Sequence, residues 1–570
     1  MRIRRLSSCR FVPLMNVLAL CCLLSACGDS ADNSKDPETT PDPVEPSLNE
    51  TLLLSAVHTS LSADGITGVH ATLLNADGSA YTSVGDELIA FESSCVTQGL
   101  AQMAPQALIQ HGIASVSYQP EGCETSDTIT ARYSRDGASI TATLALTLTG
   151  ESALSAKAQL GKTLFFDKAL SASGTLSCAG CHAPEKSYFS PQITDTPIGG
   201  IDDTSVGFRS APSAAYTSIL PAFAFTPAGG PPLPAGVQGV PRGGVMWDGR
   251  ASDIRAQAQG PFTGPHEMAN RDNAEVQQRL LSRPYLAQFT ALYGAIASTS
   301  DADVTVANMA DAIAAFERED KSFTALNSKF DAVQAGLASF TEQEANGMAL
   351  FFDVNKAGCG RCHNTLLPGM PANAPQLFSD NAYHVLAVPR NHDLPYNDDT
   401  QVDPALGALG LLSLKNGAGL GQPDHAYYDL GFCGPFRTDA TLDAPLCGAF
   451  RTPSLRNVAV KESYFHNGAF HTLREAIDFY LHRDREPARF YLRADGSPDQ
   501  IYNDLPLQFH SNVDRAPPFA PGTNGAERLT EPEIDDLIAF LCTLTDGYDP
   551  ASPDAYRLPA QCRQAMRTVP

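Results

Sequence analysis

The chain has 570 residues, of which 43% are hydrophobic and 18% charged. This composition is typical of folded proteins and excludes wholesale disorder, and the length predicts several domains. The formal net charge of −24 argues against a nucleic-acid partner, because phosphate backbones are bound by basic surfaces. Beyond the N-terminal segment, no apolar run approaches the roughly 20 residues that a membrane-spanning helix needs.

Residues 1–26 are expected to be a lipoprotein signal peptide. Four arginines precede a short apolar segment at 11–24, and the segment ends Leu24-Ser25-Ala26-Cys27, which resembles a bacterial lipobox. An ordinary signal peptide cleaved after Ala26 is the alternative. Residues 27–50 are rich in Pro, Asp and Thr and predict a disordered tether. We therefore expect a periplasmic or cell-surface protein, favouring the outer membrane, that contacts a membrane only through lipid on Cys27.

Six cysteines remain when the signal segment, Cys27 and the two motifs described below are set aside. These six fall into three local pairs. An even remainder in an exported chain predicts disulfides. Fifteen connectivities are open to six cysteines. Proximity in the sequence favours Cys95–Cys123, Cys433–Cys447 and Cys542–Cys562.

Residues 51–149 read as strands. Segments such as 68–74, 113–118 and 128–133 alternate polar and apolar residues, with Gly, Asn and Asp turns at intervals of about ten residues, which predicts an all-β sandwich. The segments at 62–65, 91–94 and 127–131 resemble bacterial Ig-like repeats of surface proteins. No catalytic grouping occurs in this region of the sequence, so we expect a spacer or docking module.

From residue 152 the apolar periodicity becomes helical. Residues 152–166 and 304–317 predict amphipathic helices. Two further helices are expected to begin at capping boxes, Thr341 to Glu344 and Thr530 to Glu533.

Two pentapeptides have the CxxCH pattern of c-type haem attachment. In this pattern two thiols form thioethers with the porphyrin and the histidine ligates the iron. A structural zinc site would need four ligands at closed spacing, and a redox dithiol would lack the following histidine. The sequence therefore predicts two covalent haem c groups, one on Cys178, Cys181 and His182, the other on Cys359, Cys362 and His363.

Seven segments surround these motifs in a fixed order: LGKTLFFD at 160–167, MWDGRA at 246–251, QAQGP at 257–261, PHEM at 265–268, AIAAFER at 312–318, FRTPSLRN at 450–457 and YFHNG at 464–468. Together they resemble the bacterial di-haem cytochrome c peroxidase and MauG family over residues 152–548. The resemblance implies two cytochrome c-like helical domains, a peroxidatic one at 152–330 and an electron-transfer one at 331–548. A tail at 549–570, pinned by a disulfide, would follow. With the Ig-like sandwich in front, the expected fold class is mostly α.

The resemblance also assigns roles to residues near the first motif. Gln257, Pro261 and Glu267 match the distal pocket, where the Glu is the acid–base group for cleavage of the peroxide O–O bond. A carboxylate within hydrogen-bond reach of peroxide can move a proton between its oxygens; on its own, however, Glu267 also reads as a solvated helix-cap carboxylate. Trp247, the single Trp of the chain, matches a relay between the haems, a role compatible with interface packing.

Two positions depart from the usual peroxidases of the family. Those proteins block the resting peroxidatic haem with a loop histidine, but no histidine occurs between His182 and His266. The N-terminal haem is therefore expected to be five-coordinate. Tyr480 stands where those peroxidases place a Met as sixth ligand of the C-terminal haem, and MauG-type members use Tyr there. Phenolate favours ferric iron and thioether favours ferrous iron; a core aromatic is the alternative role for Tyr480.

The resemblance also implies a calcium ion between the haems, held in the family by an Asn side chain and two backbone carbonyls; the matching positions are Ser210, Arg451 and Pro453. Ser in place of the family's Asn removes the strongest ligand atom, so calcium is an open expectation. His466 is expected near the C-terminal haem without ligating it.

The expected function is reduction of hydrogen peroxide at the His182 haem, with electrons passing through Trp247 and the His363 haem. The electrons would come from a small donor protein or, in a MauG-like oxidation, from a residue of a partner protein. A di-haem electron carrier without peroxide chemistry is the alternative, against which Glu267 and Gln257 argue. The Ig-like segment alone suggests a third reading, a surface-organising lipoprotein.

Overall fold

The computed structural model describes residues 48–82, 86–123, 125–150, 152–226, 239–365, 374–398, 428–437, 445–520, 522, 525–553, 556 and 558–566. The expected signal peptide, Cys27 and most of the expected tether lie outside the described residues. Within them, no helix has the length and apolar character needed to cross a membrane.

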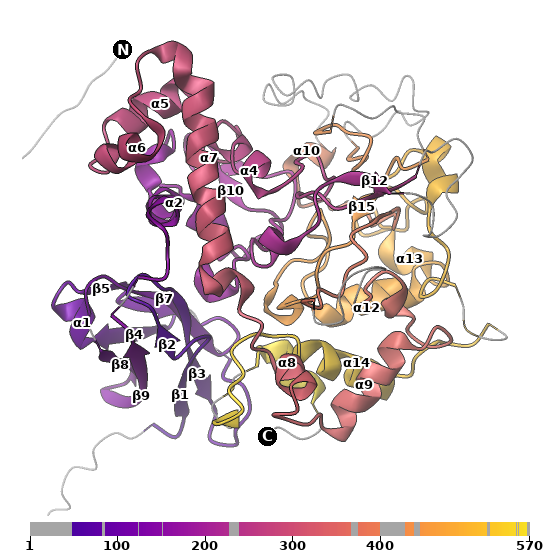
Figure 1. Cartoon of the computed structure of the whole chain (residues 1–570). Coiled ribbons are helices and arrows are strands. Elements are labelled where there is room, and N and C mark those ends of the chain that lie inside the picture. The colour runs from indigo at the N-terminus through magenta and orange to yellow at the C-terminus, as the bar shows by residue number, and fades with distance from the viewer. Residues whose placement is uncertain are drawn as a thin grey trace, which may run out of the picture. The chain divides into compact units, whose positions relative to one another are not determined.

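Residues 51–148 form two β-sheets (Figure 1). One sheet has the order β1-β3-β7-β5, and the other β2-β9-β8-β4-β6. Alternate side chains of each sheet, such as Val69, Ala71, Ile129 and Ala131, are fully buried in a shared core. The strands are β1 (Thr51–Ala56), β2 (Ser60–Leu61), β3 (Thr67–Leu74), β4 (Leu88–Ser93), β5 (Ala101–Met103), β6 (Gln106–Leu108), β7 (Ile113–Pro120), β8 (Ser126–Arg135) and β9 (Ala138–Leu148), and the short helix α1 (Ser94–Thr97) follows β4. The expected strands are confirmed, and the Ig-like assignment stays a prediction.

The β8–β9 hairpin shows how the sequence sets this topology. Asp136 and Gly137 both have positive φ, 52° and 84°, the conformation that a two-residue hairpin turn requires. The ten-residue register from Ser126 opposite Thr147 to Arg135 opposite Ala138 follows from that turn.

The helices that carry the first CxxCH motif centre on a crossing of α2 (Ala156–Phe166) and α7 (Ala302–Glu319) (Figure 1). A Cβ on Gly161 would overlap the carbonyl oxygen of Ala312, so only glycine permits this close approach. Phe165 and Phe316 pack edge to face beside the crossing, with ring centroids 5.5 Å apart. The other helices of this part are α3 (Cys178–Cys181), α4 (Ile254–Gln257), α5 (Asn273–Leu281) and α6 (Leu286–Tyr293).

The second motif follows a crossing of the same kind, between α9 (Glu342–Phe352) and α14 (Glu531–Cys542). Here a Cβ on Gly347 would overlap the carbonyl oxygen of Asp536. Both expected capping boxes are present at the starts of these two helices. The two halves thus share one arrangement, in which a helix with a central glycine precedes a CxxCH motif. The remaining helices are α8 (Lys329–Gln334), α10 (Pro395–Asp398), α12 (Leu473–His482), α13 (Pro487–Phe490) and α15 (Ala560–Ala565).

The expectation of a mostly α chain is not supported. Helices form a minority of the chain, because nine strands precede them and long irregular connections separate them. Several connections pair into two-stranded sheets, formed by β10 (Ile198–Gly199) with β11 (Ser205–Val206), β12 (Ala224–Thr226) with β13 (Val240–Arg242) and β14 (Tyr383–His384) with β15 (Phe450–Arg451).

The three favoured cysteine pairs lie at distances that disulfides span. The Cα–Cα distance is 5.9 Å for Cys95–Cys123, 4.9 Å for Cys433–Cys447 and 5.9 Å for Cys542–Cys562. The four cysteines of the CxxCH motifs are free thiols, so the structure keeps them apart from the other pairs.

Candidate haem-binding sites

The two CxxCH motifs fold alike. Each forms one helical turn, α3 in the first and a 3₁₀ turn, Cys359–Arg361, in the second. The backbone N–H of each histidine donates to the carbonyl of the first cysteine, at 2.9 Å in both motifs. This turn brings both thiols and the imidazole of each motif together.

The two motif histidines are oriented by backbone carbonyls. His182 Nδ1 lies 3.1 Å from the carbonyl oxygen of Tyr188, and His363 Nδ1 lies 2.8 Å from that of Phe378. A carbonyl accepts, so Nδ1 carries the proton and Nε2 keeps its lone pair for a metal. Burial lowers the pKa of both rings, which favours the neutral, ligating form. The CxxCH pattern predicts a haem c here. Two free thiols suit attachment of its porphyrin, and the imidazole so oriented suits ligation of its iron.

The second motif opens on a large apolar cavity. Cys359, Cys362, His363 and Tyr480 all line it, together with Trp247, His466 and aromatic side chains. A histidine with a free Nε2 and a tyrosine therefore share one cavity with the two thiols. The structure brings these sequence-predicted residues together, and the cavity fits a planar, largely apolar cofactor. His466, expected here, stacks on Phe450 with ring centroids 3.7 Å apart.

Tyr480 lies on α12, packed between aromatic rings. Phe519 and Phe465 contact its ring, with centroids 5.4 and 5.6 Å away. Among the described residues, its hydroxyl has no hydrogen-bond partner. Burial raises the pKa of Tyr480, and the nearby Cys362 thiol adds to the shift. The phenol is half-buried and lines the same cavity as the haem-attachment cysteines, a placement that suits a ligand as well as a core aromatic.

Trp247 lies where the two halves meet. Its Nε1–H donates to the carbonyl of Ser210 at 2.7 Å, and its own carbonyl accepts from the Arg451 N–H at 2.8 Å. Ser210 belongs to the N-terminal half and Arg451 to the C-terminal half. The indole is 8% exposed and lines the cavity of the second motif. This placement suits both a relay and a packing residue.

The three residues expected in the distal pocket follow one another along α4 and the next turns. Gln257 ends α4, Pro261 lies in a 3₁₀ turn, and the Glu267 N–H donates to the Gly264 carbonyl at 2.9 Å. Solvent reaches the Glu267 side chain, yet dense surrounding protein raises its pKa, and Arg250 opposes the shift. Its charge also raises the pKa of the Cys181 thiol, which places the carboxylate near the first motif.

The residues expected to bind calcium do not fit that ion. Lys461 Nζ donates to Ser210 Oγ at 2.7 Å, and Trp247 occupies the Ser210 carbonyl. The other two expected positions, Arg451 and Pro453, would offer only backbone carbonyls, and the Arg451 guanidinium is buried in the same cavity as Lys461. Calcium prefers six to eight oxygen ligands with carboxylates among them, whereas this site presents cations.

Comparison with known proteins identifies the family. The model of the di-haem cytochrome c peroxidase family matches residues 155–339. The methylamine utilization protein MauG of Paracoccus denitrificans is 33% identical over 405 residues, covering 69% of this chain and 90% of that protein. The chain belongs to the di-haem cytochrome c peroxidase and MauG family.

Other relatives agree. Cytochrome c551 peroxidase of Nitrosomonas europaea is 28% identical, covering 56% of this chain and 71% of that protein. The crystal structure of the diheme peroxidase BthA from Burkholderia thailandensis superposes with a TM-score of 0.56 at 31% identity, covering 70% of this chain and 89% of that chain. As a member of this family, the protein is an oxidoreductase that acts on peroxide, and the family carries two haems.

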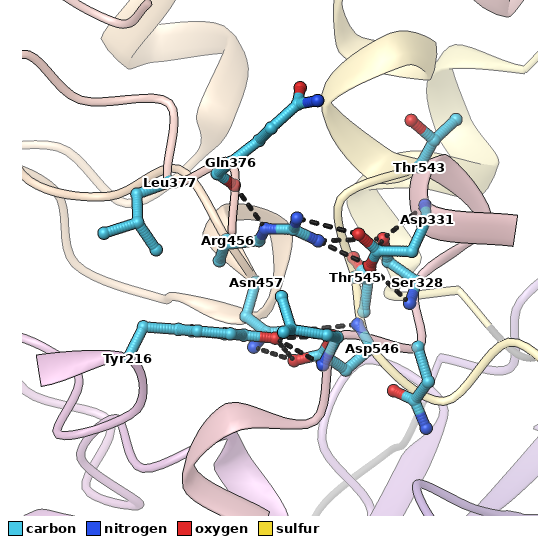
Figure 2. Close-up of polar contacts among 12 residues, drawn as sticks. Tyr216, Ser328, Asp331, Gln376, Leu377, Arg456, Asn457, Thr543, Thr545 and Asp546 are labelled. Atoms are coloured by element: carbon cyan, nitrogen blue, oxygen red, sulfur yellow. Dashed lines mark hydrogen bonds and ion pairs between the residues drawn. The ribbon is translucent and has the colours of Figure 1, made fainter. Parts of the chain in front are cut away.

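A buried polar network, which sequence reasoning missed, ties the two halves of this di-haem peroxidase together. Figure 2 shows Tyr216 of the N-terminal half donating to Asp546, at 2.9 and 2.8 Å to its two oxygens. Asn457 also donates to Asp546, at 2.7 Å. Beside them, Arg456 binds both oxygens of Asp331 at 2.6 and 2.8 Å. Partners lie up to 330 positions apart, so no local pattern reveals them.

We expect Arg456→Met to destabilise the peroxidase by about 3 kcal/mol, because removing one partner of a buried ion pair leaves the other uncompensated. The Arg456 side chain is 1% exposed. Differential scanning calorimetry measures the loss. The matched control is Arg485→Met, whose partner Glu527 lies 4.0 Å away and is 57% exposed, so its loss should stay below about 1 kcal/mol. Equal losses in the two variants would contradict the role given to Arg456.

Proposed function

We propose that this protein reduces hydrogen peroxide at a haem attached covalently through Cys178 and Cys181 and ligated by His182. A second haem, on Cys359, Cys362 and His363, would serve electron transfer. The observation that carries the proposal is the shared geometry of the motifs, in which each histidine holds its Nε2 free beside two free thiols. A di-haem electron carrier remains the alternative, and the raised pKa of Glu267 argues against it, because electron transfer alone needs no proton-exchanging carboxylate.

Within this proposal, Glu267 moves the proton. Bound haem supplies the redox chemistry that cleaves the O–O bond. The Glu267 carboxylate accepts a proton from one peroxide oxygen and returns it to the other, so that water leaves; two electrons and two further protons complete the reduction to two waters. The pKa of Glu267 is raised, which brings it closer to the operating pH. The ionised carboxylate is then a stronger base, while the protonated carboxyl group is a weaker acid. Gln257 and Pro261 would shape the pocket around the substrate.

Trp247 and Tyr480 determine how oxidising equivalents leave this site. An oxidisable indole held between the halves suits transfer from one haem site to the other. We propose that Tyr480 would hold the second haem together with His363, because both line one cavity and the phenol hydroxyl has no hydrogen-bond partner among the described residues. A phenolate favours ferric iron. This favours a MauG-like oxidation of a partner protein over stepwise acceptance of electrons from a small donor protein.

We also propose export and anchoring through lipid on Cys27, with the protein in the periplasm or at the cell surface. The three cysteine pairs at disulfide distance support an oxidising compartment. The β-sheet region at 51–149 would be a spacer or docking module ahead of the haem domains.

Two double variants test the proposed function. Cys178→Ser/Cys181→Ser should lose the N-terminal haem, by pyridine haemochrome assay, and abolish peroxide consumption. Its matched control, Cys359→Ser/Cys362→Ser, should lose one haem as well but keep the initial reaction with one equivalent of peroxide, while losing turnover with an electron donor. Peroxide consumption by the first variant at the wild-type rate would refute the assignment of the reactive haem.

We further expect the resting ferric protein to react with peroxide without prior one-electron reduction. The reason is that no histidine occurs between His182 and His266 to block the distal side. Electron paramagnetic resonance of the resting protein should show one high-spin haem alongside a low-spin one. Two low-spin haems, with a reaction only after half-reduction, would contradict this expectation.

A further inference from the structure

We propose that the side chain of Lys461 takes the place, between the two haem sites, of the calcium ion that the family resemblance implies. The inference rests on the proposed function insofar as two haems bind at the two motifs. Its central residue, Lys461, is one that the sequence did not single out.

The first step is the position of the Lys461 ammonium. Its Nζ donates to Ser210 Oγ at 2.7 Å and lies 3.4 Å from the Ala211 carbonyl oxygen. Ser210 is the position where the family places its calcium-binding side chain. The remaining oxygen of Ser210, its carbonyl, accepts from Trp247 Nε1. The one side-chain oxygen that the expected ion would use is therefore hydrogen-bonded to an ammonium, and the neighbouring Ser210 carbonyl is hydrogen-bonded to the indole.

The second step is electrostatic. Lys461 is 9% exposed, and no carboxylate among the described residues pairs with it; its Nζ lies over the Phe189 ring, 5.3 Å from the centroid. Arg451 is buried in the same cavity and likewise has no ion pair within the described part of the chain. The carboxylates that line the same cavity, Asp429, Asp504 and Asp514, pair with Arg209, Arg390 and His384 instead. Two cations without a carboxylate of their own repel a divalent cation at close range in a low-dielectric site. Calcium therefore loses its side-chain ligand and meets an unfavourable field.

The third step places this charge between the motifs. Lys461 lines the cavity of the second motif together with His363 and Tyr480. Its Nζ also lies over the ring of Phe189, the residue next to Tyr188, whose carbonyl orients His182 of the first motif. A buried charge is costly unless it is compensated. The carboxylates of bound haem are the anions that this cavity would receive, and Lys461 and Arg451 are the cations that would compensate them.

Calcium content and haem potentials test the inference on the holoprotein. Wild type should contain no stoichiometric calcium, show no binding on calorimetric titration with calcium chloride, and keep its melting temperature in EGTA. Lys461→Met should shift the midpoint potentials of the haems to lower values, because loss of a positive charge favours ferric iron. Lys461→Arg should retain the wild-type potentials. Lys157→Met, which removes a half-exposed lysine paired with Asp311, controls for net charge.

One equivalent of bound calcium, or a melting temperature that falls in EGTA and recovers with calcium, would overturn the inference. So would unchanged potentials in Lys461→Met. If Lys461→Met fails to fold, the calcium measurements on wild type and the midpoint potentials of Lys461→Arg still test the inference. A wild-type protein with fewer than two haems would refute the proposed function instead, and the haemochrome assay detects that case separately.

Discussion

Glu267→Gln is expected to slow the reaction with peroxide by about 10²–10⁴-fold, the usual contribution of general acid–base catalysis. The amide fills the same space but cannot accept the proton that must move between the peroxide oxygens. Dense protein around Glu267 raises its pKa and so matches the group to proton exchange. Stopped-flow spectrophotometry of the ferric protein measures the rate, and pyridine haemochrome confirms that both haems remain.

The pH dependence separates a proton shuttle from a structural role. Because the pKa of Glu267 is raised, its carboxylate form is lost as pH falls through that raised value, and the wild-type rate should decline there. Glu267→Gln should lack this decline. Glu275→Gln on α5, which removes a partly exposed carboxylate paired with Arg279, is the matched control and should keep the wild-type profile. A near-normal rate in Glu267→Gln would show that another group moves the proton.

Tyr480→Met is expected to raise the midpoint potential of the second haem by about 0.1 V or more, within the roughly 0.8 V that axial ligands span. A thioether favours ferrous iron, whereas phenolate favours ferric iron. The variant should still react with peroxide at the first haem but lose oxidation of a partner protein. Potentiometric titration followed by absorbance measures the shift.

Tyr480→Phe is the matched control for this experiment, because it keeps the ring packed against Phe465 and Phe519 and removes only the oxygen. The Phe variant should lose the sixth ligand and become high-spin at the second haem. Unchanged spectra and potential in both variants would make Tyr480 a core aromatic, and the MauG-like part of the proposal would then fail.

Local signals in the sequence predicted much of this structure. The capping boxes at Thr341 and Thr530 are formed as expected, because a cap depends on residues three positions apart. The CxxCH motifs likewise fix their own turn. The overall balance of helix was overestimated, because periodicity reveals helices but says little about the long connections between them.

What sequence reasoning missed depends on contacts between distant residues. Ser210 and Lys461 are 251 positions apart, and no local pattern shows that an ammonium meets the expected calcium ligand. The sequence indicates the two helix crossings only weakly. Gly161 and Gly347 each lie inside a predicted helix, where glycine is unfavourable. Such a glycine indicates close packing, but the partner helix follows only from the fold.

Single-turnover stopped-flow of the fully ferric wild-type protein with one equivalent of peroxide tests the central claim most directly. The account predicts a rapid spectral change without any added reductant, with both haems spectrally affected because Trp247 and Tyr480 connect the second site to the first. A ferric protein whose spectrum stays unchanged until one haem has been reduced would contradict it.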